Sequence, residues 1–322
     1  MSNSVTIRVP ARLHLGFLDP SGRSGRRFGS LGLPLCEPET VVTLSRSGET
    51  VVEGPERDRA AAHLSAMAKR LGIRTQHRLV VEEVIPRHAG LGSGTQIALA
   101  VAAALRTLHG LPLDIEGDAV LLARGGRSGI GIASFAGGGV IVDAGNDGSG
   151  KPPPVVARLP FPDDWRVLLI LDRAQDGLHG EDEVEAFRRL PPFPATGVGE
   201  ICRHVLTGVM PALVEQDIAT FGAAITAIQL LVGEHFAPAQ GGVFTSKRVE
   251  AVAKRLAKAG AVGIGQSSWG PTGFAFASSE AAAATMVAAA SEVIEDGMEV
   301  RIVRGRSSGA EISSTGLNLV GS

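Results

Sequence analysis

The chain has 322 residues, of which 44% are hydrophobic and 20% are charged, a composition typical of globular proteins with a full hydrophobic core. Its 31 basic and 33 acidic residues nearly balance, which argues against a general nucleic-acid binder. The cysteines, Cys36 and Cys202, suit neither a disulfide framework nor a metal site. The N-terminus lacks the apolar core of a signal peptide, and the apolar runs fall short of the ~20 residues of a membrane span. We therefore expect a cytoplasmic protein that binds neither nucleic acid nor membrane.

The first half of the chain alternates β-branched segments with helical ones. Strands are predicted over residues 4–9, 40–45, 77–84 and 137–145, and helices over residues 56–72, 95–109 and 115–124. Residues 10–35 are a long stretch rich in glycine and arginine, to which we assign no element.

The second half begins after the most proline-rich stretch, residues 151–164. We place a domain boundary there, which gives an N-terminal domain over residues 1–160 and a C-terminal domain over residues 161–322. Strands are then predicted over 165–171, 261–265, 273–277 and 299–303, and helices over 198–236, 246–259 and 279–295. Strands and helices do not alternate strictly, which predicts an α+β fold with antiparallel sheets.

A glycine loop at the start of the helix predicted over 95–109 has the composition of a phosphate site. Backbone N–H groups at a helix start are unsatisfied, and glycines let them surround an anion. The alternative is a glycine turn that only lets the helix pack closely. A Walker loop is excluded because no lysine follows the last glycine. The candidate residues for binding phosphate or pyrophosphate are Gly90, Leu91, Gly92, Ser93, Gly94, Thr95 and Gln96.

Two further segments have a similar character. The second glycine loop, GIGQSSWGPTGFAFA (263–277), lies between two predicted strands, and RLHLG (12–16) follows the first strand. Three such segments in a fixed order are hard to explain by packing alone. The candidates for binding substrate in these segments are Arg12, Gln266, Ser267, Ser268 and Gly270.

The three segments resemble the motifs of the GHMP superfamily of small-molecule kinases. ARLHLGF (11–17) is similar to the first motif, PRHAGLGSGTQIALA (86–100) to the second and GIGQSSWGPTGFA (263–275) to the third. The resemblance covers nearly the whole chain. It implies a two-domain α+β fold, with an N-terminal domain like ribosomal protein S5, a ferredoxin-like C-terminal domain and the ligand site between them.

Five more stretches resemble one branch of this superfamily, the β-ribofuranosylaminobenzene 5′-phosphate synthases. They are residues 124–145, 177–187, 217–229 and 235–242 and the GQSSWGPT form of the third motif. The resemblance implies a phosphoribosyl transferase of tetrahydromethanopterin biosynthesis. Such an enzyme condenses phosphoribosyl pyrophosphate with 4-aminobenzoate or 4-hydroxybenzoate and releases CO₂ and pyrophosphate. It also implies a homodimer and a divalent cation such as Mg²⁺, and we expect no organic cofactor.

One departure from the kinases agrees with this branch. Several GHMP kinases place an aspartate base shortly after a Ser-Gly pair, but residues 127–132 read RSGIGI and contain no carboxylate. Decarboxylative ribosylation has no acceptor hydroxyl to deprotonate, so it needs no such base. Two alternatives stay open: an ATP-dependent small-molecule kinase, which would bind a nucleotide, and a non-catalytic ligand-binding protein.

The remaining candidates carry charge or can transfer a proton. The guanidinium group of arginine suits the binding of phosphate and carboxylate, and Arg26 and Arg127 stand in glycine-rich stretches. These two arginines and His14, which can transfer a proton, are the catalytic candidates. For His14 the alternative is a packed, hydrogen-bonded histidine. Ser128 and Gly129 are candidates for binding substrate, and Arg23, Arg27 and Arg124 are further anion candidates unless they are solvated surface charge. The candidate metal ligands are Ser93, Glu181 and Asp182, although the two acids would equally suit the first turn of a helix.

Overall fold

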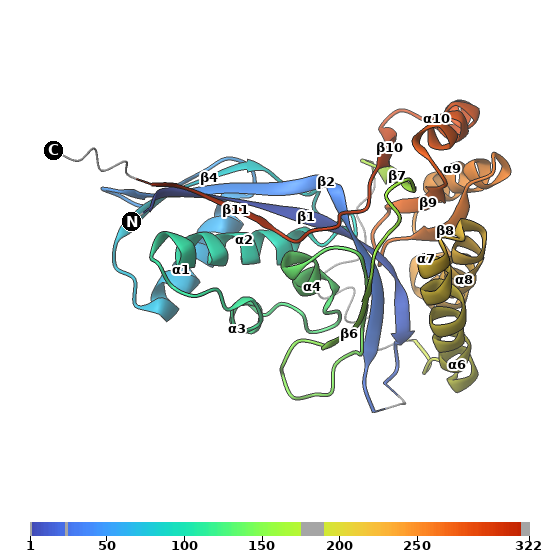
Figure 1. Ribbon diagram of the computed structural model, residues 1–322, viewed down its shortest axis with the longest axis horizontal. Coiled ribbons are helices and arrows are strands. Elements are labelled where there is room, and N and C mark those ends of the chain that lie inside the picture. Colours follow the sequence, from blue (N-terminus) through green and yellow to red (C-terminus); the bar gives the residue numbers. More distant parts are fainter. Residues whose placement is uncertain (1, 23–24, 175–189, 317–322) are drawn as a thin grey trace.

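The computed structural model describes residues 2–22, 25–174 and 190–316, which form two sheets lying next to each other (Figure 1). Within these residues the first sheet has seven strands in the order β11-β1-β2-β4-β3, with β5 pairing with β2 and β6 with β5. Among the described strands of this sheet, only β3 and β4 pair in parallel; the other pairs are antiparallel. The strands are β1 (Ser2–Asp19), β2 (Phe28–Ser47), β3 (Val51–Glu53), β4 (Gln76–Glu83), β5 (Val140–Asp143), β6 (Val155–Leu159) and β11 (Glu311–Gly316).

A long hairpin of β1 and β2 forms the centre of this sheet, and it occupies most of residues 10–35, where no element was predicted. The register continues from Ser4 opposite Ser45 to Asp19 opposite Phe28. The sequence does alternate here: Ala11, Leu13, Leu15 and Phe17 are all buried. The predicted strands over 4–9 and 40–45 were therefore too short, because the glycines and arginines of this stretch obscure the alternation.

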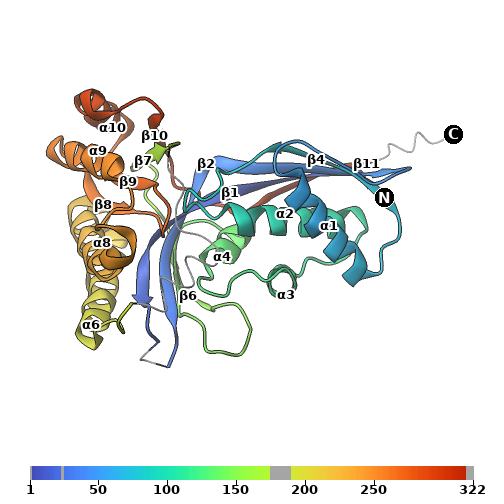
Figure 2. The same cartoon turned by 180° about the vertical axis from the view of Figure 1, so that it is seen from behind.

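Helices cover one face of the first sheet, as Figure 2 shows from behind. They are α1 (Arg57–Leu71), α2 (Ser93–Leu108), α3 (Ile115–Leu121) and α4 (Ile130–Ala136). Helix α2 is buried along most of its length, and small residues such as Ala98, Ala100 and Ala102 let it lie close to the sheet. Its apolar face fixes the position of its N-terminus, into which the glycine loop leads.

The second sheet has four strands within the described residues, in the order β10-β7-β9-β8. Alternate residues of its strand β7 enter different cores. Leu169 packs in the core cluster that contains Phe221, whereas Leu168 and Ile170 pack in the cluster that contains Val252. The strands are β7 (Arg166–Asp172), β8 (Val262–Gln266), β9 (Gly273–Ala277) and β10 (Met298–Val303). The helices beside them are α6 (Ala195–His204), π-helical η1 (Val205–Val209), α7 (Met210–Glu215), α8 (Ile218–Gln240), α9 (Lys247–Lys258), α10 (Glu280–Ala289) and 3₁₀-helical η2 (Ser291–Val293).

Helix α8 is the one described helix that is long and apolar enough to cross a membrane by length and composition. Its residues Phe221, Ile225 and Ile228 are buried in the core that joins the two sheets. This packing is typical of a core helix in a globular domain.

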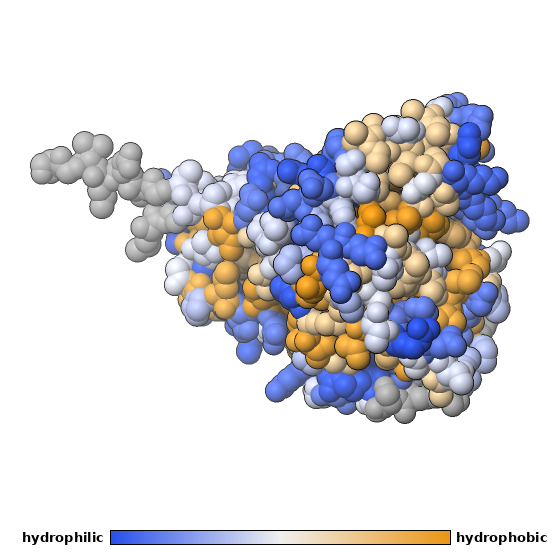
Figure 3. Space-filling view, turned by 45° about the vertical axis from the view of Figure 1, so that its right-hand side comes forward, coloured by the Kyte–Doolittle hydropathy of each residue, from blue (hydrophilic) through white to orange (hydrophobic). Residues whose placement is uncertain are grey.

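On the face that Figure 3 presents, hydrophobic patches are interrupted by hydrophilic ones.

The chain returns to the first sheet with β11, which pairs with β1.

The predicted α+β class is confirmed. The strands β3, β6 and β11 and the helix α4 were not predicted. Strands β6 and β11 have mostly exposed side chains, so their sequences lack an alternating burial pattern. The division into residues 1–160 and 161–322 stays a prediction, and β11 pairs across it.

Candidate functional site

The three segments that the sequence analysis grouped together meet in space. The N–H of Arg12 donates to the carbonyl of Leu91 at 3.0 Å, which joins β1 to the loop before α2. The hydroxyl of Ser267 accepts from the N–H of His14 at 3.0 Å. It also donates to the carbonyl of Gly90 at 2.7 Å. One serine side chain therefore connects all three segments.

Two glycines permit this close contact. Gly90 has a φ of 76°, and a Cβ atom built on it would lie 2.1 Å from the carbonyl oxygen of Ser267. A Cβ on Gly270 would lie 2.2 Å from the carbonyl carbon of Ala89. Both distances are far inside van der Waals contact. Any other residue at either position would push the two loops apart.

The phosphate loop leads directly into the N-terminus of α2. Gly92, with a φ of 84°, is the N-cap, and its carbonyl accepts from the N–H groups of Thr95 and Gln96 at 3.1 and 3.2 Å. The N–H groups of Ser93 and Gly94 come before the first intrahelical bonds, and both residues line the adjacent cleft. The helix dipole adds partial positive charge at this point. The geometry suits a phosphate or pyrophosphate group.

A cleft of about 680 Å³ lies at this helix start. It brings together most of the residues predicted to form the site, from all three motifs and from the turn before α4. The predicted residues that line it are Arg12, His14, Gly90, Leu91, Gly92, Ser93, Gly94, Thr95, Arg124, Arg127, Ser128, Ser268 and Gly270.

The arginines among the described lining residues are Arg12, Arg59, Arg124 and Arg127. A Cβ on Gly94 would lie 3.3 Å from Nη1 of Arg124, so this guanidinium stands beside the start of α2. Burial lowers the pKa of Arg124, and the charge of Arg59 lowers it further. Arg59 pairs with Glu56 at 3.4 Å, and the same carboxylate also pairs with Arg87. An anion in the cleft would offset the repulsion between these cations.

His63 stands near two of these arginines without adding charge. Its side chain is buried, and burial lowers its pKa to about 4, with smaller contributions from the charges of Arg124 and Arg59. The imidazole is therefore neutral at pH 7.

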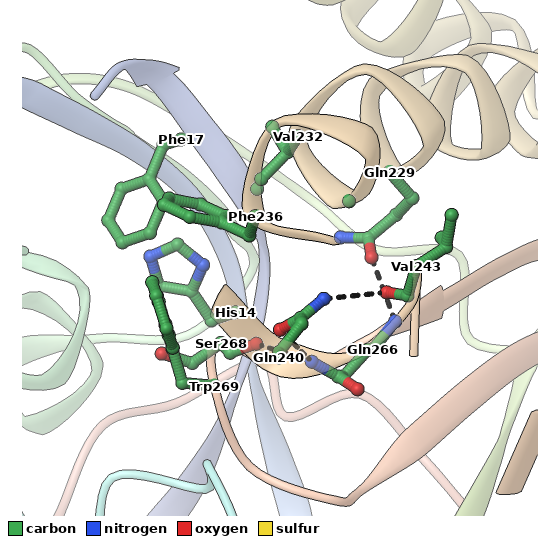
Figure 4. A pocket seen from close by; sticks show the side chains of 12 residues that line it. His14, Phe17, Gln229, Val232, Phe236, Gln240, Val243, Gln266, Ser268 and Trp269 are labelled. Atoms are coloured by element: carbon green, nitrogen blue, oxygen red, sulfur yellow. Dashed lines mark hydrogen bonds between the residues drawn. The ribbon is translucent and has the colours of Figure 1, made fainter. Parts of the chain in front are cut away.

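His14 lies at the inner end of the cleft. Its side chain is 2% exposed, and burial, aided by the charge of Arg12, holds its pKa well below the usual range. The imidazole is therefore neutral at pH 7. Its ring lies 4.4 Å from that of Phe17, and Figure 4 shows it beside Phe236 and Trp269. Its Nε2 is buried and has no hydrogen-bond partner within the described residues.

Two predicted site residues support the cleft from behind. Gln96 is fully buried, and its Nε2 donates to the carbonyl of Gly131 at 2.9 Å. Gly129 caps α4 and donates its N–H to Oδ2 of Asp143 at 2.9 Å, while the N–H of Gly145 donates to Oδ1 at 2.9 Å. Burial raises the pKa of Asp143 to about 6, against the opposite effect of these hydrogen bonds.

Arg26 does not line the cleft. Its Nε and Nη2 donate to the carbonyls of Ala144 and Gly145 at 3.0 Å each, and its Nη1 lies 3.6 Å from Asp147. The structure gives it a part in holding the turn after β5. Its predicted catalytic role stays a prediction. Ser267 is buried between the motifs, and Gln266 lines a smaller cavity next to the cleft.

The described residues do not by themselves build a metal site. They contain no group of three or more His, Cys, Asp or Glu side chains that could hold an ion. The side chains described around the cleft include the hydroxyls of Ser93, Thr95 and Ser128 but no carboxylate, which Mg²⁺ normally requires from a protein. The predicted ligands Glu181 and Asp182 lie outside the described residues.

The lining residues that were not predicted from the sequence include Phe17, Arg59 and Trp269. Arg59 belongs to a charged helical segment, where an arginine indicates only a solvated face. Trp269 did carry a signal, since an indole inside a glycine loop has little reason to be there unless it is buried. It is 2% exposed, and its ring lies 4.6 Å from that of Phe236.

The fold has many relatives of known structure. Homoserine kinase from Cytophaga hutchinsonii superposes with a TM-score of 0.68 at 19% identity, covering 97% of this chain and 98% of that one. Mevalonate diphosphate decarboxylase from Staphylococcus aureus gives 0.68 at 15% identity, covering 98% and 99%. At these identities the likeness shows the fold alone.

Sequence comparisons identify the family. The chain matches the GHMP kinases N terminal domain over residues 58–139 and the GHMP kinases C terminal domain over residues 209–296. It is 34% identical to the β-ribofuranosylphenol 5′-phosphate synthase of Methanothermobacter thermautotrophicus, covering 82% of this chain and 86% of that protein. It is 38% identical to the protein of the same name from Archaeoglobus fulgidus, covering 70% and 75%. The chain therefore belongs to the GHMP kinase superfamily and, within it, to the β-ribofuranosylphenol 5′-phosphate synthase family.

Proposed function

We propose that this chain condenses phosphoribosyl pyrophosphate with 4-hydroxybenzoate or 4-aminobenzoate. The products are CO₂, pyrophosphate and a β-ribofuranosyl phenol or aminobenzene 5′-phosphate. The observation that carries the proposal is a single cleft with two kinds of wall. Arg12, Arg124 and Arg127 stand around a helix N-terminus and suit two phosphorylated groups and a carboxylate. Phe17 and Trp269 line the same cleft and suit an aromatic ring.

The bond changes of this reaction need little proton transfer. The C1–O bond of the ribose breaks, and its electron pair leaves with pyrophosphate. The ring carbon that bears the carboxylate supplies a π pair to C1, and loss of CO₂ returns an electron pair that restores aromaticity. No net proton leaves the acceptor, which agrees with a cleft whose described lining residues include no Asp or Glu. Catalysis would come from positioning and from N–H and guanidinium donors at the departing pyrophosphate.

The names of the relatives favour one acceptor. They are synthases of a ribofuranosylphenol phosphate, so we place 4-hydroxybenzoate ahead of 4-aminobenzoate. We further propose that Mg²⁺ enters with phosphoribosyl pyrophosphate, and that the enzyme is a cytoplasmic homodimer of tetrahydromethanopterin biosynthesis.

An ATP-dependent kinase is the second candidate. The glycine loop at the start of α2 and the fold shared with homoserine kinase favour it. The absence of a carboxylate from residues 127–132 argues against it. A ligand-binding protein without catalytic activity is the third.

One assay separates the three. The protein receives Mg²⁺, phosphoribosyl pyrophosphate and carboxyl-labelled 4-hydroxybenzoate or 4-aminobenzoate, and released CO₂ is counted. A parallel sample contains ATP and a panel of small alcohols and is followed for ADP. We expect CO₂ release that depends on phosphoribosyl pyrophosphate. ADP without CO₂ would establish the kinase, and thermal stabilisation by ligand without turnover would favour the binding protein.

A further inference from the structure

A small cavity adjoins the cleft on the side of α8 and the third motif (Figure 4). Its volume is about 20 Å³, room for about one water-sized group. Four residues line both spaces, so the cavity opens from the inner end of the cleft. They are His14, Phe17, Ser268 and Trp269.

The glutamines in the cavity wall are already engaged by the protein. Gln229 donates to the carbonyl of Leu15 at 2.8 Å and accepts from the N–H of Gln266 at 2.8 Å. Gln266 accepts from the N–H of Thr245 at 2.6 Å and donates to the carbonyl of Ser268 at 3.1 Å. Gln240 donates to the carbonyl of Val243 at 2.9 Å. These bonds orient the three side chains and leave them little capacity for a ligand.

His14 differs from the glutamines. Its Nε2 is buried and lacks a hydrogen-bond partner within the described residues. The indole of Trp269, in the same wall, has other interactions. An imidazole nitrogen without a partner in a buried site costs free energy unless a ligand bonds to it. The rest of the wall around it is largely apolar, with Phe17, Val232 and Phe236. The cavity therefore suits one small group that can form a hydrogen bond, attached to an apolar body.

We infer that this cavity receives the para substituent of the benzoate acceptor and that His14 recognises it through a hydrogen bond. The inference rests on the proposed function. A hydroxyl or amino group has one heavy atom and fits the volume, whereas a carboxylate has three and does not. The ring then lies beside Phe17 and Trp269. The para relationship directs the carboxyl-bearing carbon back toward the arginines of the cleft, where the ribose would be attacked.

Equilibrium binding tests the recognition without turnover. Calorimetry in the presence of inorganic pyrophosphate compares 4-hydroxybenzoate with 4-methylbenzoate, which has nearly the same shape but cannot form the hydrogen bond. We expect the hydroxyl compound to bind about 3- to 10-fold more tightly to the wild type. In His14→Phe, which keeps a ring against Phe17, the two compounds should bind equally. A preference that survives in His14→Phe would overturn the inference.

A second variant tests the cavity by filling it. Val232→Ile adds one methylene group to its wall, and Val214→Ile makes the same change on α7, where the side chain is 71% exposed. We expect Val232→Ile to raise KM for 4-hydroxybenzoate several-fold with KM for phosphoribosyl pyrophosphate unchanged. Equal effects on both substrates, or no effect, would contradict the inference.

The two proposals fail in different ways. Wild-type protein that releases no CO₂ but distinguishes the two benzoates in calorimetry would refute the proposed reaction and keep the acceptor site. Protein that releases CO₂ while His14→Phe retains the hydroxyl preference would keep the reaction and refute the role of His14. Melting temperatures of both variants check that each is folded.

Discussion

At the scale of single residues, Arg124 gives the clearest indication that the cleft binds an anion. Its Nε is buried without a hydrogen-bond partner within the described residues, and its guanidinium stands beside the start of α2. A partly buried guanidinium with a buried, unsatisfied donor costs folding free energy, which an anionic ligand can offset on binding. The residue is therefore better explained by ligand binding than by stability.

In Arg124→Gln, ligand binding should therefore weaken while the stability of the fold is kept. We expect KM for phosphoribosyl pyrophosphate to rise about 10- to 100-fold, since a charge-assisted hydrogen bond contributes roughly 1.5–3 kcal/mol. The melting temperature should stay the same or rise, because a partly buried charge with an unsatisfied donor is removed. Arg70→Gln, on the exposed last turn of α1, is the matched control. A lower melting temperature with an unchanged KM would show that Arg124 is structural.

Some residues of this site could be predicted from the sequence and others could not. Sequence reasoning found the glycine loop and Ser267, because a loop that approaches another backbone closely must be rich in glycine and hydroxyls. It did not distinguish Arg26, which binds the turn after β5, from Arg127, which lines the cleft. Both arginines stand in glycine-rich stretches. Tertiary contacts separate them: the hairpin of β1 and β2 carries Arg26, whereas the turn that Asp143 holds carries Arg127 into the cleft.

At the scale of elements, Asp143 links β5 to the start of α4. Its carboxylate accepts the N–H groups of Gly129 and Gly145, and so fixes the turn that carries Arg127 and Ser128 into the cleft. Burial of this carboxyl group opposes its ionisation and raises its pKa to about 6. The same group therefore orders the site and makes folding depend on pH.

The sign of that dependence follows from linkage. In the unfolded chain Asp143 ionises near pH 3.8, whereas in the folded protein it keeps its proton up to about pH 6. Folding therefore binds a proton between these values, and the contribution of Asp143 to stability falls as pH rises through this window. In urea unfolding at pH 4–6, we expect wild type to lose stability relative to Asp143→Asn by on the order of 3 kcal/mol. Relative to Asp147→Asn, at an exposed carboxylate whose pKa is lowered by hydrogen bonds from Ser149, wild type should show no such loss. A parallel pH dependence of wild type and Asp143→Asn would refute this role of Asp143.

The elements that were predicted well from the sequence have a clear local pattern, a continuous apolar run in β9 and a helical period in α1. Strand β9 spans Gly273–Ala277, as predicted, and α1 spans Arg57–Leu71 against a predicted 56–72. One element that was missed, β11, is stabilised by a distant partner. Strand β11 has exposed side chains, and its strand conformation comes from pairing with β1, about 300 residues earlier in the chain. Tertiary contacts of this kind leave no trace in local sequence.

At the scale of the whole molecule, the two sheets share one core. The same buried cluster contains Leu13 and Leu31 of the first sheet, Leu169 of the second and Phe221 of α8. The site lies where the halves meet, because β1 supplies Arg12 and His14 and the loop after β8 supplies Ser267 and Trp269. Loss of either half would therefore expose apolar surface and take the site apart.

This shared core predicts a single cooperative unfolding transition. Both tryptophans, Trp165 and Trp269, belong to the second half, so their fluorescence in urea reports on that half, while hydrogen exchange of β1 and β4 reports on the first sheet. We expect the two midpoints to coincide. Deleting residues 310–322, which removes β11 from its pairing with β1, should lower both midpoints together. Two separate transitions, or a deletion that affects only the first sheet, would show that the halves fold independently and that the site forms by docking of two preformed domains.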